Sequence, residues 1–148
     1  MMIEEITDLF VRDLRKLKYE IALYRNHDKL WYQEKAIANP AGNLCLHLIG
    51  NLKAYIGTGI GKISYTRDRE LEFSATDVPV SVLLSEIDDT IIVVQKSLQT
   101  LKDIDLDKEF PVKIWDQSAS ISFTLFHLLA HLSYHLGQIN YHRRLLDF

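Results

Sequence analysis

The chain has 148 residues, of which 47% are hydrophobic and 25% charged, as in an ordinary globular domain. Since 17 Lys and Arg stand against 20 Asp and Glu, the net charge of -3 predicts no basic surface for nucleic acid or an acidic membrane. Collagen-like, low-complexity and disordered chains are excluded, and we expect a single domain over residues 1–148 with one hydrophobic core.

Apolar residues recur every three or four positions in the first segment, which is typical of an amphipathic helix that faces a core. The pattern predicts a helix over residues 2–26. Its apolar stripe consists of Ile3, Ile6, Phe10, Leu14, Leu17, Ile21 and Tyr24.

A second helix is predicted to begin at Asn39 and Pro40, with Asn39 as the N-cap and Pro40 in the first helical position. It should run to the glycines at positions 57, 59 and 61. The polar connection that follows, residues 62–77, is longer than bundle connections usually are. We therefore expect it to be a crossover or a functional loop.

A third helix is predicted to follow Pro79 and to reach Leu101, and a fourth to run from Ser120 to Leu146. Residues 103–115 between them are expected to be extended, although Pro111 argues against a central strand. The second and fourth helices are apolar almost all round and should lie inside the fold. The prediction is an all-α protein, a four-helix bundle with a long crossover connection.

Cys45 is the only cysteine, and the acidic start at Glu4 and Glu5 is not followed by a secretory signal region. No apolar run approaches the roughly 18 residues that a membrane span requires. We therefore expect a cytoplasmic protein with neither membrane nor nucleic acid as a partner.

Polar residues interrupt the two most apolar helices at helical spacing, so each helix carries a polar row on one face. Buried polar side chains need hydrogen-bond or metal partners, and two rows that face each other can serve as partners. The rows are Asn43, His47 and Asn51 in the second helix, and His127, His131 and His135 with Gln138 and His142 in the fourth.

His131 and His135 are one helical turn apart, so each can direct a nitrogen at one ion. His47 from the second helix would complete a three-nitrogen site that leaves a coordination position open for water or substrate. The alternative is that these histidines are ordinary core or surface residues, as most helical histidines are. The third histidine and its flanking amides favour the metal site.

Other candidate motifs are weaker. No glutamate follows His131, so the general base of an H-E-x-x-H protease is missing. The stretch from Gly57 to Lys62 lacks the first glycine and the Ser or Thr of a phosphate loop. Cys45 is expected to be a small buried apolar residue, and residues 66–73 a solvated charged loop that lies near the second helix.

Three segments resemble DinB-like proteins. The stretch from His127 to Ile139 is similar to their last helix, Asn43 to Leu52 is similar to their second helix, and Arg67, Arg69 and Glu70 are similar to the charged loop of one subgroup. The resemblance implies a bundle of the DinB/YfiT type and a divalent metal ion, commonly nickel or zinc. Matched by position, its three histidine ligands are His47, His131 and His135.

The resemblance has further implications. His127 matches a family histidine that is not usually a ligand, so it belongs to the surroundings of the site or to the core. Leu136 stands where many members carry an arginine, which removes any role of that arginine here. A homodimer is implied, and some members are transferases or isomerases that use low-molecular-weight thiols such as bacillithiol or mycothiol.

We expect a small-molecule substrate and consider three functions. The first is a metal-dependent thiol S-transferase, and the second is a metal-dependent hydrolase with Glu70 as its base. The third is a non-enzymatic, stress-linked module for metal binding or dimerisation. The residues expected to support the ligands or to bind substrate are Asn43, Asn51, Arg67, Arg69, Glu70, His127 and Gln138.

Overall fold

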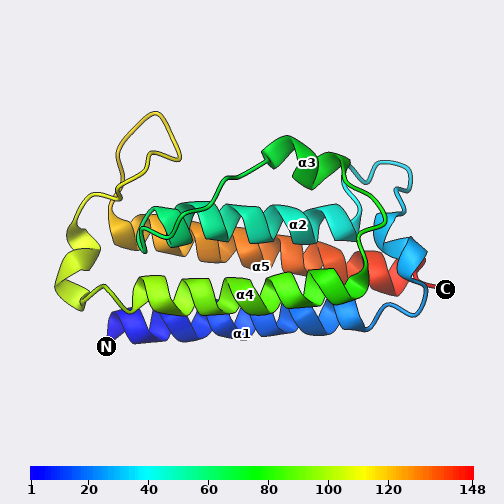
Figure 1. The fold of residues 1–148 in the computed structure, drawn as a ribbon, viewed down its shortest axis with the longest axis horizontal. Coiled ribbons are helices and arrows are strands. Elements are labelled where there is room, and N and C mark those ends of the chain that lie inside the picture. The colour runs from blue at the N-terminus through cyan, green and yellow to red at the C-terminus, as the bar shows by residue number, and fades with distance from the viewer.

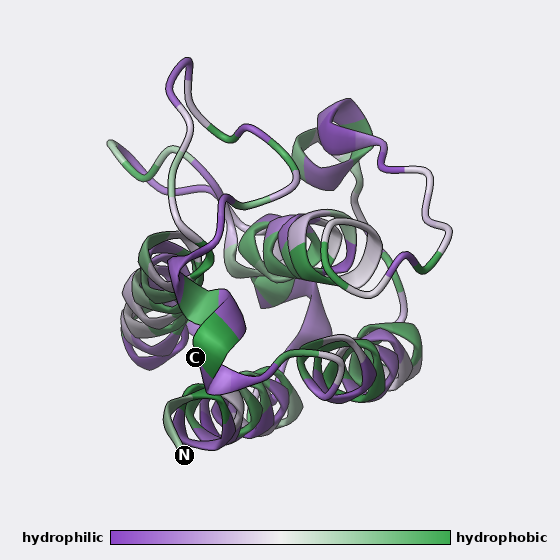
Figure 2. Cartoon of the chain, turned by 90° about the vertical axis from the view of Figure 1, so that its left-hand side faces the viewer, coloured by the Kyte–Doolittle hydropathy of each residue, from purple (hydrophilic) through white to green (hydrophobic).

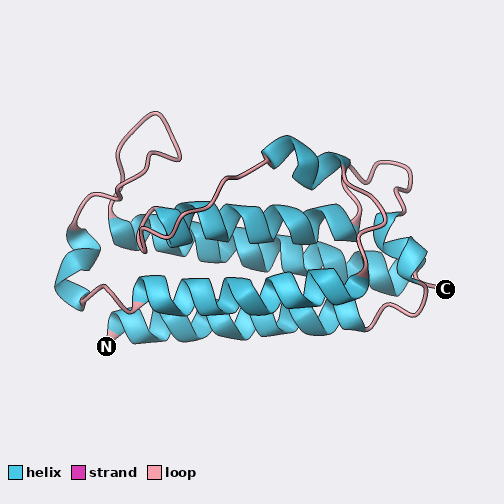
Figure 3. Cartoon of the chain, viewed as in Figure 1, coloured by secondary structure: helices cyan, strands magenta, loops and turns pink.

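Helices account for all the regular structure of residues 1–148, as the computed structural model shows (Figure 1), and no β-strand is present (Figure 3). The expectation of an all-α protein is therefore confirmed. The α-helices are α1 (Met2–Ala22), α2 (Ala41–Leu52), α3 (Arg69–Ser74), α4 (Val80–Leu98) and α5 (Ile121–Leu146). Three shorter helical turns are the 3₁₀ turns η1 (His27–Trp31) and η3 (Asp103–Asp107) and the π-turn η2 (Lys53–Thr58).

The four long helices enclose a common core. Both α1 and α2 pack against α4 and against α5 (Figure 2), whereas α3 lies outside this group and packs on α2. Phe10, Leu14, Leu48 and Ile87 are completely buried between them. Burying each such side chain contributes about 1.5–3 kcal/mol of hydrophobic free energy.

The predicted stripe of the first helix is buried along its whole length, but the helix ends earlier than expected. It stops at Ala22 instead of residue 26. The carboxylate of Asp147 accepts hydrogen bonds from the backbone N–H groups of Arg25 and Asn26, at 2.8 and 3.0 Å. These bonds turn the chain away from the helix axis, and no local sequence signal announces them because their acceptor lies more than 120 residues away.

The second helix begins at Ala41 with Pro40 as its N-cap, so the prediction of Asn39 as N-cap was wrong. The proline has extended backbone torsions and lies just outside the first turn. Beyond Leu52 the chain continues as a π-turn as far as Thr58. In that turn, buried Lys53 forms ion pairs of 2.8 Å with both Glu86 and Asp89 of α4.

The connections contain helical segments that the sequence did not predict. The polar connection after residue 61 contains α3, whose N-cap Asp68 accepts a hydrogen bond from the N–H of Leu71. Helix α4 ends at Leu98 instead of Leu101, and the segment expected to be extended begins with the 3₁₀ turn η3. Helix α5 starts after Ser120 as predicted, since that side chain accepts from the N–H of Phe123.

Helix α5 is not an interior helix, and this prediction needs correction. Residues of α2 are nearly all buried, but α5 exposes an apolar face that includes Phe123, Phe126, Tyr134 and Tyr141. The reason is geometric, since α5 contacts α1 and α2 on one side and no long helix covers its other side.

A buried hydrogen-bond chain ties the C-terminal part of α5 to the region after α1. The hydroxyl of Tyr24 donates to Nδ1 of His142 at 2.7 Å, and Nε2–H of His142 donates to the carbonyl of Tyr32 at 2.8 Å. Replacing His142 with phenylalanine should lower the free energy of unfolding by about 1–3 kcal/mol, because both partners lose their bond. Urea denaturation measures this, and His27→Phe, at an exposed position, should change stability by less than about 0.5 kcal/mol.

The wild type and His142→Phe should also differ in how their free energy of unfolding depends on pH. Burial lowers the pKa of His142 below its ordinary value of 6.5, so between the two values the unfolded chain binds the proton and the folded chain does not. The contribution of His142 is therefore complete above about pH 6.5 and is lost as the pH falls toward its folded-state pKa. The free energy of unfolding of the wild type should therefore exceed that of His142→Phe by less at pH 5 than at pH 7.5. A difference that stays constant over this range would contradict the prediction.

Candidate metal centre

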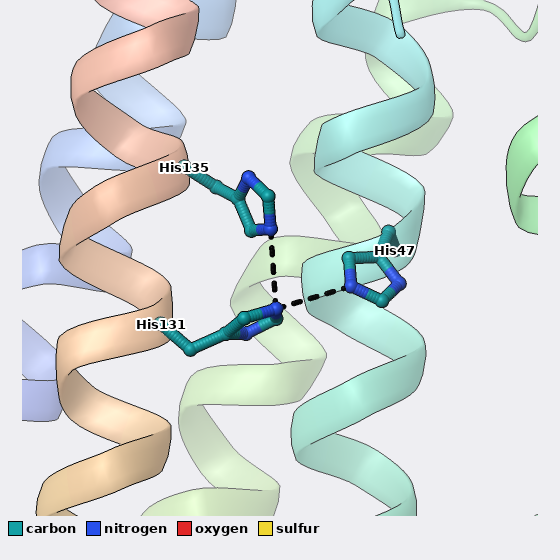
Figure 4. Close-up of side chains that lie close together, drawn as sticks. All are labelled: His47, His131 and His135. Atoms are coloured by element: carbon teal, nitrogen blue, oxygen red, sulfur yellow. Dashed lines mark hydrogen bonds between the residues drawn. The ribbon is translucent and has the colours of Figure 1, made fainter. Parts of the chain in front are cut away.

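Three imidazole rings from two neighbouring helices meet in one place. His47 projects from α2, and His131 and His135 project from α5, which runs antiparallel beside it (Figures 1 and 4). Nε2 of His131 lies 3.2 Å from Nε2 of His47 and 3.1 Å from Nε2 of His135. The three histidines offer ligand atoms that all lie within 4.8 Å of one another, so the cluster could hold a metal ion.

The outer nitrogens of two rings have acceptors. Nδ1 of His47 lies 3.1 Å from Oε1 of Glu72, and Nδ1 of His135 lies 2.7 Å from Oε1 of Gln138. A carboxylate and an amide oxygen only accept hydrogen bonds, so both Nδ1 atoms carry the proton. In the neutral rings, both Nε2 atoms then present lone pairs to the centre of the cluster.

This proton pattern fits a cation better than it fits hydrogen bonds among the rings. A neutral His131 has at most one Nε2–H, which cannot serve both neighbouring lone pairs fully. A metal ion at about 2.0–2.1 Å from each nitrogen places pairs of ligand nitrogens about 2.9–3.4 Å apart. Two of the three separations, 3.1 and 3.2 Å, fall in that range, and all three ligand atoms lie within 4.8 Å of one another, so the residues could hold a divalent transition metal ion.

Burial favours the neutral form of His47 and His131, which is the form that binds metal ions. Burial, and after it the charges of the neighbouring His135 and His47, lowers the pKa of His131 to about 4. Burial also lowers the pKa of His47, although the hydrogen bond and charge of Glu72 oppose this shift. At neutral pH both rings therefore have a free lone pair without first losing a proton.

Glu72 in α3 lies against the outer nitrogen of His47, and it was not among the site residues predicted from the sequence. Its carboxylate is buried and also accepts from Nε and Nη2 of Arg67, at 2.9 and 3.0 Å. Gly50 makes room for it, because a Cβ atom there would overlap Oε2 of Glu72. Glu72 thus joins His47 to Arg67, the arrangement that commonly orients a metal-binding histidine.

Asn43 fixes the segment that carries Glu72. Its side-chain amide donates to the backbone carbonyls of Glu72 and Ala75, at 3.0 and 2.8 Å. These carbonyls belong to the end of α3, where the helix leaves acceptors without intrahelical partners. Asn43 therefore supports the cluster indirectly, through the position of α3.

Aromatic rings border the histidines. Phe73 packs on His47 with ring centroids 4.8 Å apart, and Tyr134 packs on His135 at 5.5 Å. One turn before His131, the exposed ring of His127 stacks edge-on against Trp115 at 4.6 Å. His127 is therefore held by an aromatic contact outside the three-ring cluster.

The remaining candidate residues take no direct part in the three-histidine cluster. Asn51 is buried, and its Oδ1 has no hydrogen-bond partner. The guanidinium of Arg69 lies over the ring of Phe73 at 6.0 Å. Glu70 is exposed in the first turn of α3, and its side chain makes no hydrogen bond or ion pair, so the geometry favours Glu72 over Glu70 as the carboxylate of this site.

Cys45 takes no part in the cluster. It is fully buried, and burial raises the pKa of its thiol to about 12. A protonated, enclosed thiol is neither a good nucleophile nor a metal ligand, as the sequence analysis expected.

The comparisons with known proteins identify the family. A match to DUF1572, described as a protein of unknown function, extends over residues 3–147. The chain belongs to the DUF1572 family. No curated protein and no solved structure matched it. The family match therefore includes the helices and the loop that form the histidine cluster, but it assigns no reaction to them.

None of the α-helices combines the length and the apolar character that crossing a bilayer would require.

Proposed function

We propose that this DUF1572 protein is a metal-dependent S-transferase that joins a low-molecular-weight thiol to a small electrophilic substrate. The observation that carries the proposal is the convergence of three Nε2 atoms, two of them on rings whose Nδ1 atoms have acceptors. We assign His47, His131 and His135 as ligands of a divalent ion, with nickel or zinc as the first candidates.

We also place the protein in the DinB-like superfamily. The packing of α1, α2, α4 and α5 supports a single-domain four-helix bundle of the DinB/YfiT type. The connection that carries α3 then serves as the long crossover, and it supplies Glu72 to the site. A cytoplasmic homodimer remains our expectation from the same resemblance.

Three imidazoles and no carboxylate ligand leave a divalent ion with its full positive charge, which favours an anionic fourth ligand. Such an ion would supply the Lewis acidity that converts a thiol into a thiolate at neutral pH. Glu72 and Gln138 hold the protons on the outer nitrogens of His47 and His135. Phe73 and Tyr134 lie against those rings and offer apolar contacts to a substrate.

A hydrolase is less well supported because it needs a base that can take a proton from water. Glu70 is exposed without polar contacts, and both carboxylate oxygens of Glu72 are engaged by His47 and Arg67. No unengaged loop carboxylate therefore stands beside the rings. A thiol nucleophile needs no such base once it is ionised.

The experiment is a conjugation assay of nickel-loaded and zinc-loaded protein with bacillithiol, mycothiol and cysteine, each with a generic electrophile such as a chloronitrobenzene. We expect the loaded protein to exceed the metal-free protein at least about tenfold with one thiol. Loaded His127→Ala, which leaves the three rings intact, is expected to retain the activity.

Two outcomes would count against the transferase. If no thiol is conjugated faster by loaded protein, the transferase proposal is wrong. If protein purified without chelators or a histidine tag also holds less than about a tenth of an equivalent of transition metal, the non-enzymatic module becomes the better explanation.

A further inference from the structure

His131 is the one ring of the three-histidine cluster whose outer nitrogen has no partner. Nδ1 of His47 lies against the carboxylate of Glu72, and Nδ1 of His135 lies against the amide oxygen of Gln138. Nδ1 of His131 is buried and makes no hydrogen bond. Because nearly all buried polar atoms in proteins are hydrogen-bonded, this nitrogen needs an explanation.

Asn51 has the complementary defect, since its side-chain oxygen is an acceptor without a donor. The residue is only 7% exposed, and Oδ1 makes no hydrogen bond. Asn51 lies one helical turn after His47, on the face of α2 that carries His47 toward α5. The two unpartnered atoms therefore belong to facing helices of the same site.

The direction of the two helices brings Asn51 to the level of His131. Because α2 and α5 are antiparallel, the turn of α2 that follows His47 lies beside the turn of α5 that precedes His131 (Figure 4). Side chains of an α-helix lean toward its N-terminus, so the ring of His131 leans toward that same turn. Asn51 is thus the nearest unpartnered acceptor that the opposite helix offers to this ring.

The position of the ring proton explains why the two atoms do not pair when the rings bond only to one another. Nε2 of His131 then faces the lone pairs of His47 and His135, at 3.2 and 3.1 Å, and must carry the proton of the neutral ring. Its Nδ1 is in that case a lone pair. A lone pair and the oxygen of Asn51 are both acceptors, so no hydrogen bond forms between them.

We infer that Asn51 is the positioning residue of His131, and that its Oδ1 accepts a hydrogen bond from Nδ1 when Nε2 of His131 binds a metal ion. The ring stays neutral, because one proton leaves Nε2 and one is taken up at Nδ1. Each of the three rings then has its own oxygen acceptor, which fixes both its tautomer and its orientation. The inference rests on the metal centre assigned under the proposed function, but not on the transfer of sulfur.

The first test compares zinc affinity with stability in Asn51→Leu. Leucine removes the acceptor, so competition with a chelator should show zinc binding weakened about 10- to 100-fold. Without zinc, the melting temperature of Asn51→Leu should equal or exceed that of the wild type, because the change removes a buried oxygen that has no donor. A residue needed only for folding would not separate these two readouts.

Two further variants sharpen this comparison. Asn51→Asp keeps an acceptor oxygen in the same place and should bind zinc within about threefold of the wild type, whereas a buried carboxylate without this role would harm the protein. Thr124→Val is the matched control, because Oγ1 of Thr124 is another buried oxygen without a partner, seven residues before His131 on α5. It should leave the zinc affinity within about twofold.

Nuclear magnetic resonance of the ring nitrogens reads the proton directly, in protein labelled with ¹⁵N-histidine. Without zinc, His131 should carry its proton on Nε2, and with zinc it should show an Nδ1–H that exchanges slowly with water. In zinc-loaded Asn51→Leu the same proton should exchange faster.

The outcomes separate this inference from the proposed function. Zinc binding by Asn51→Leu as tight as that of the wild type, or an Nδ1–H on His131 before zinc is added, would overturn the role of Asn51 and leave the transferase untouched. A wild type that binds zinc but conjugates no thiol would count against the transferase alone. A wild type that binds no zinc would overturn both the metal centre and this inference.

Discussion

Replacing His131 with alanine is expected to abolish stoichiometric metal binding. His131 is the central ring of the cluster, since its Nε2 is the one within 3.2 Å of both other Nε2 atoms. Dividing the roughly 10–16 kcal/mol of a four-ligand zinc site among its ligands assigns each a share of about 2.5–4 kcal/mol. The affinity should therefore fall on the order of 100- to 1,000-fold.

Isothermal titration with zinc and with nickel measures this loss, and thermal unfolding supplies an independent readout. A ligand that binds only the folded state raises the melting temperature, so zinc should stabilise the wild type and have little effect on His131→Ala. The matched control is His127→Ala, which removes an imidazole from the same helix one turn away and breaks only the contact with Trp115. Equal metal binding by the wild type and both variants would show that the three rings do not hold the ion.

The histidine cluster could be anticipated because the information is local and periodic. The spacing of His131 and His135 places both on one face of a helix, and His47 occupies an equally apolar helix. That the two helices are neighbours followed from their two polar rows, since each row of a largely apolar helix needs a partner, and the contacts between α2 and α5 agree with it. The rings could instead have turned toward separate backbone carbonyls, and the structure shows that they converge.

The supporting residues could not be anticipated because they depend on long-range contacts. The sequence placed residues 66–73 in a solvated loop and favoured Glu70 within it. The loop instead contains α3, and Asn43 holds that helix so that Glu72 turns inward and Glu70 outward. The signal available in the sequence was Gly50, three residues after His47 and on the same face of α2, where a small residue admits the carboxylate.

Helix α5 also shows what could not be predicted from the sequence. Its sequence is apolar all round, which predicts complete burial, yet only one side of it has neighbours within the chain. Hydropathy reports that a face avoids water but does not say whether the covering surface belongs to the same molecule.

Replacing Glu72 with glutamine should weaken metal binding about 10- to 100-fold without unfolding the protein. The amide is nearly isosteric, but it carries no charge and can present its NH₂ group to His47. Nδ1 of His47 then loses its fixed acceptor, and the ring can exchange between tautomers or rotate. Competition with a zinc chelator at pH 7.5 measures the affinity, and the circular dichroism spectrum shows whether the helices remain intact.

Glu70→Gln is the matched control, because it makes the same chemical change two residues away on the exposed side of α3 and should leave the affinity within about twofold. Arg67→Met removes the other partner of the Glu72 carboxylate and should cause a smaller loss than Glu72→Gln, since the contact between Glu72 and His47 remains. If Glu70→Gln weakened metal binding more than Glu72→Gln, Glu70 and not Glu72 would be the functional carboxylate. If the Glu72 carboxylate acts on the metal ion through His47, the loss of metal affinity should be largest for Glu72→Gln, smaller for Arg67→Met and smallest for Glu70→Gln.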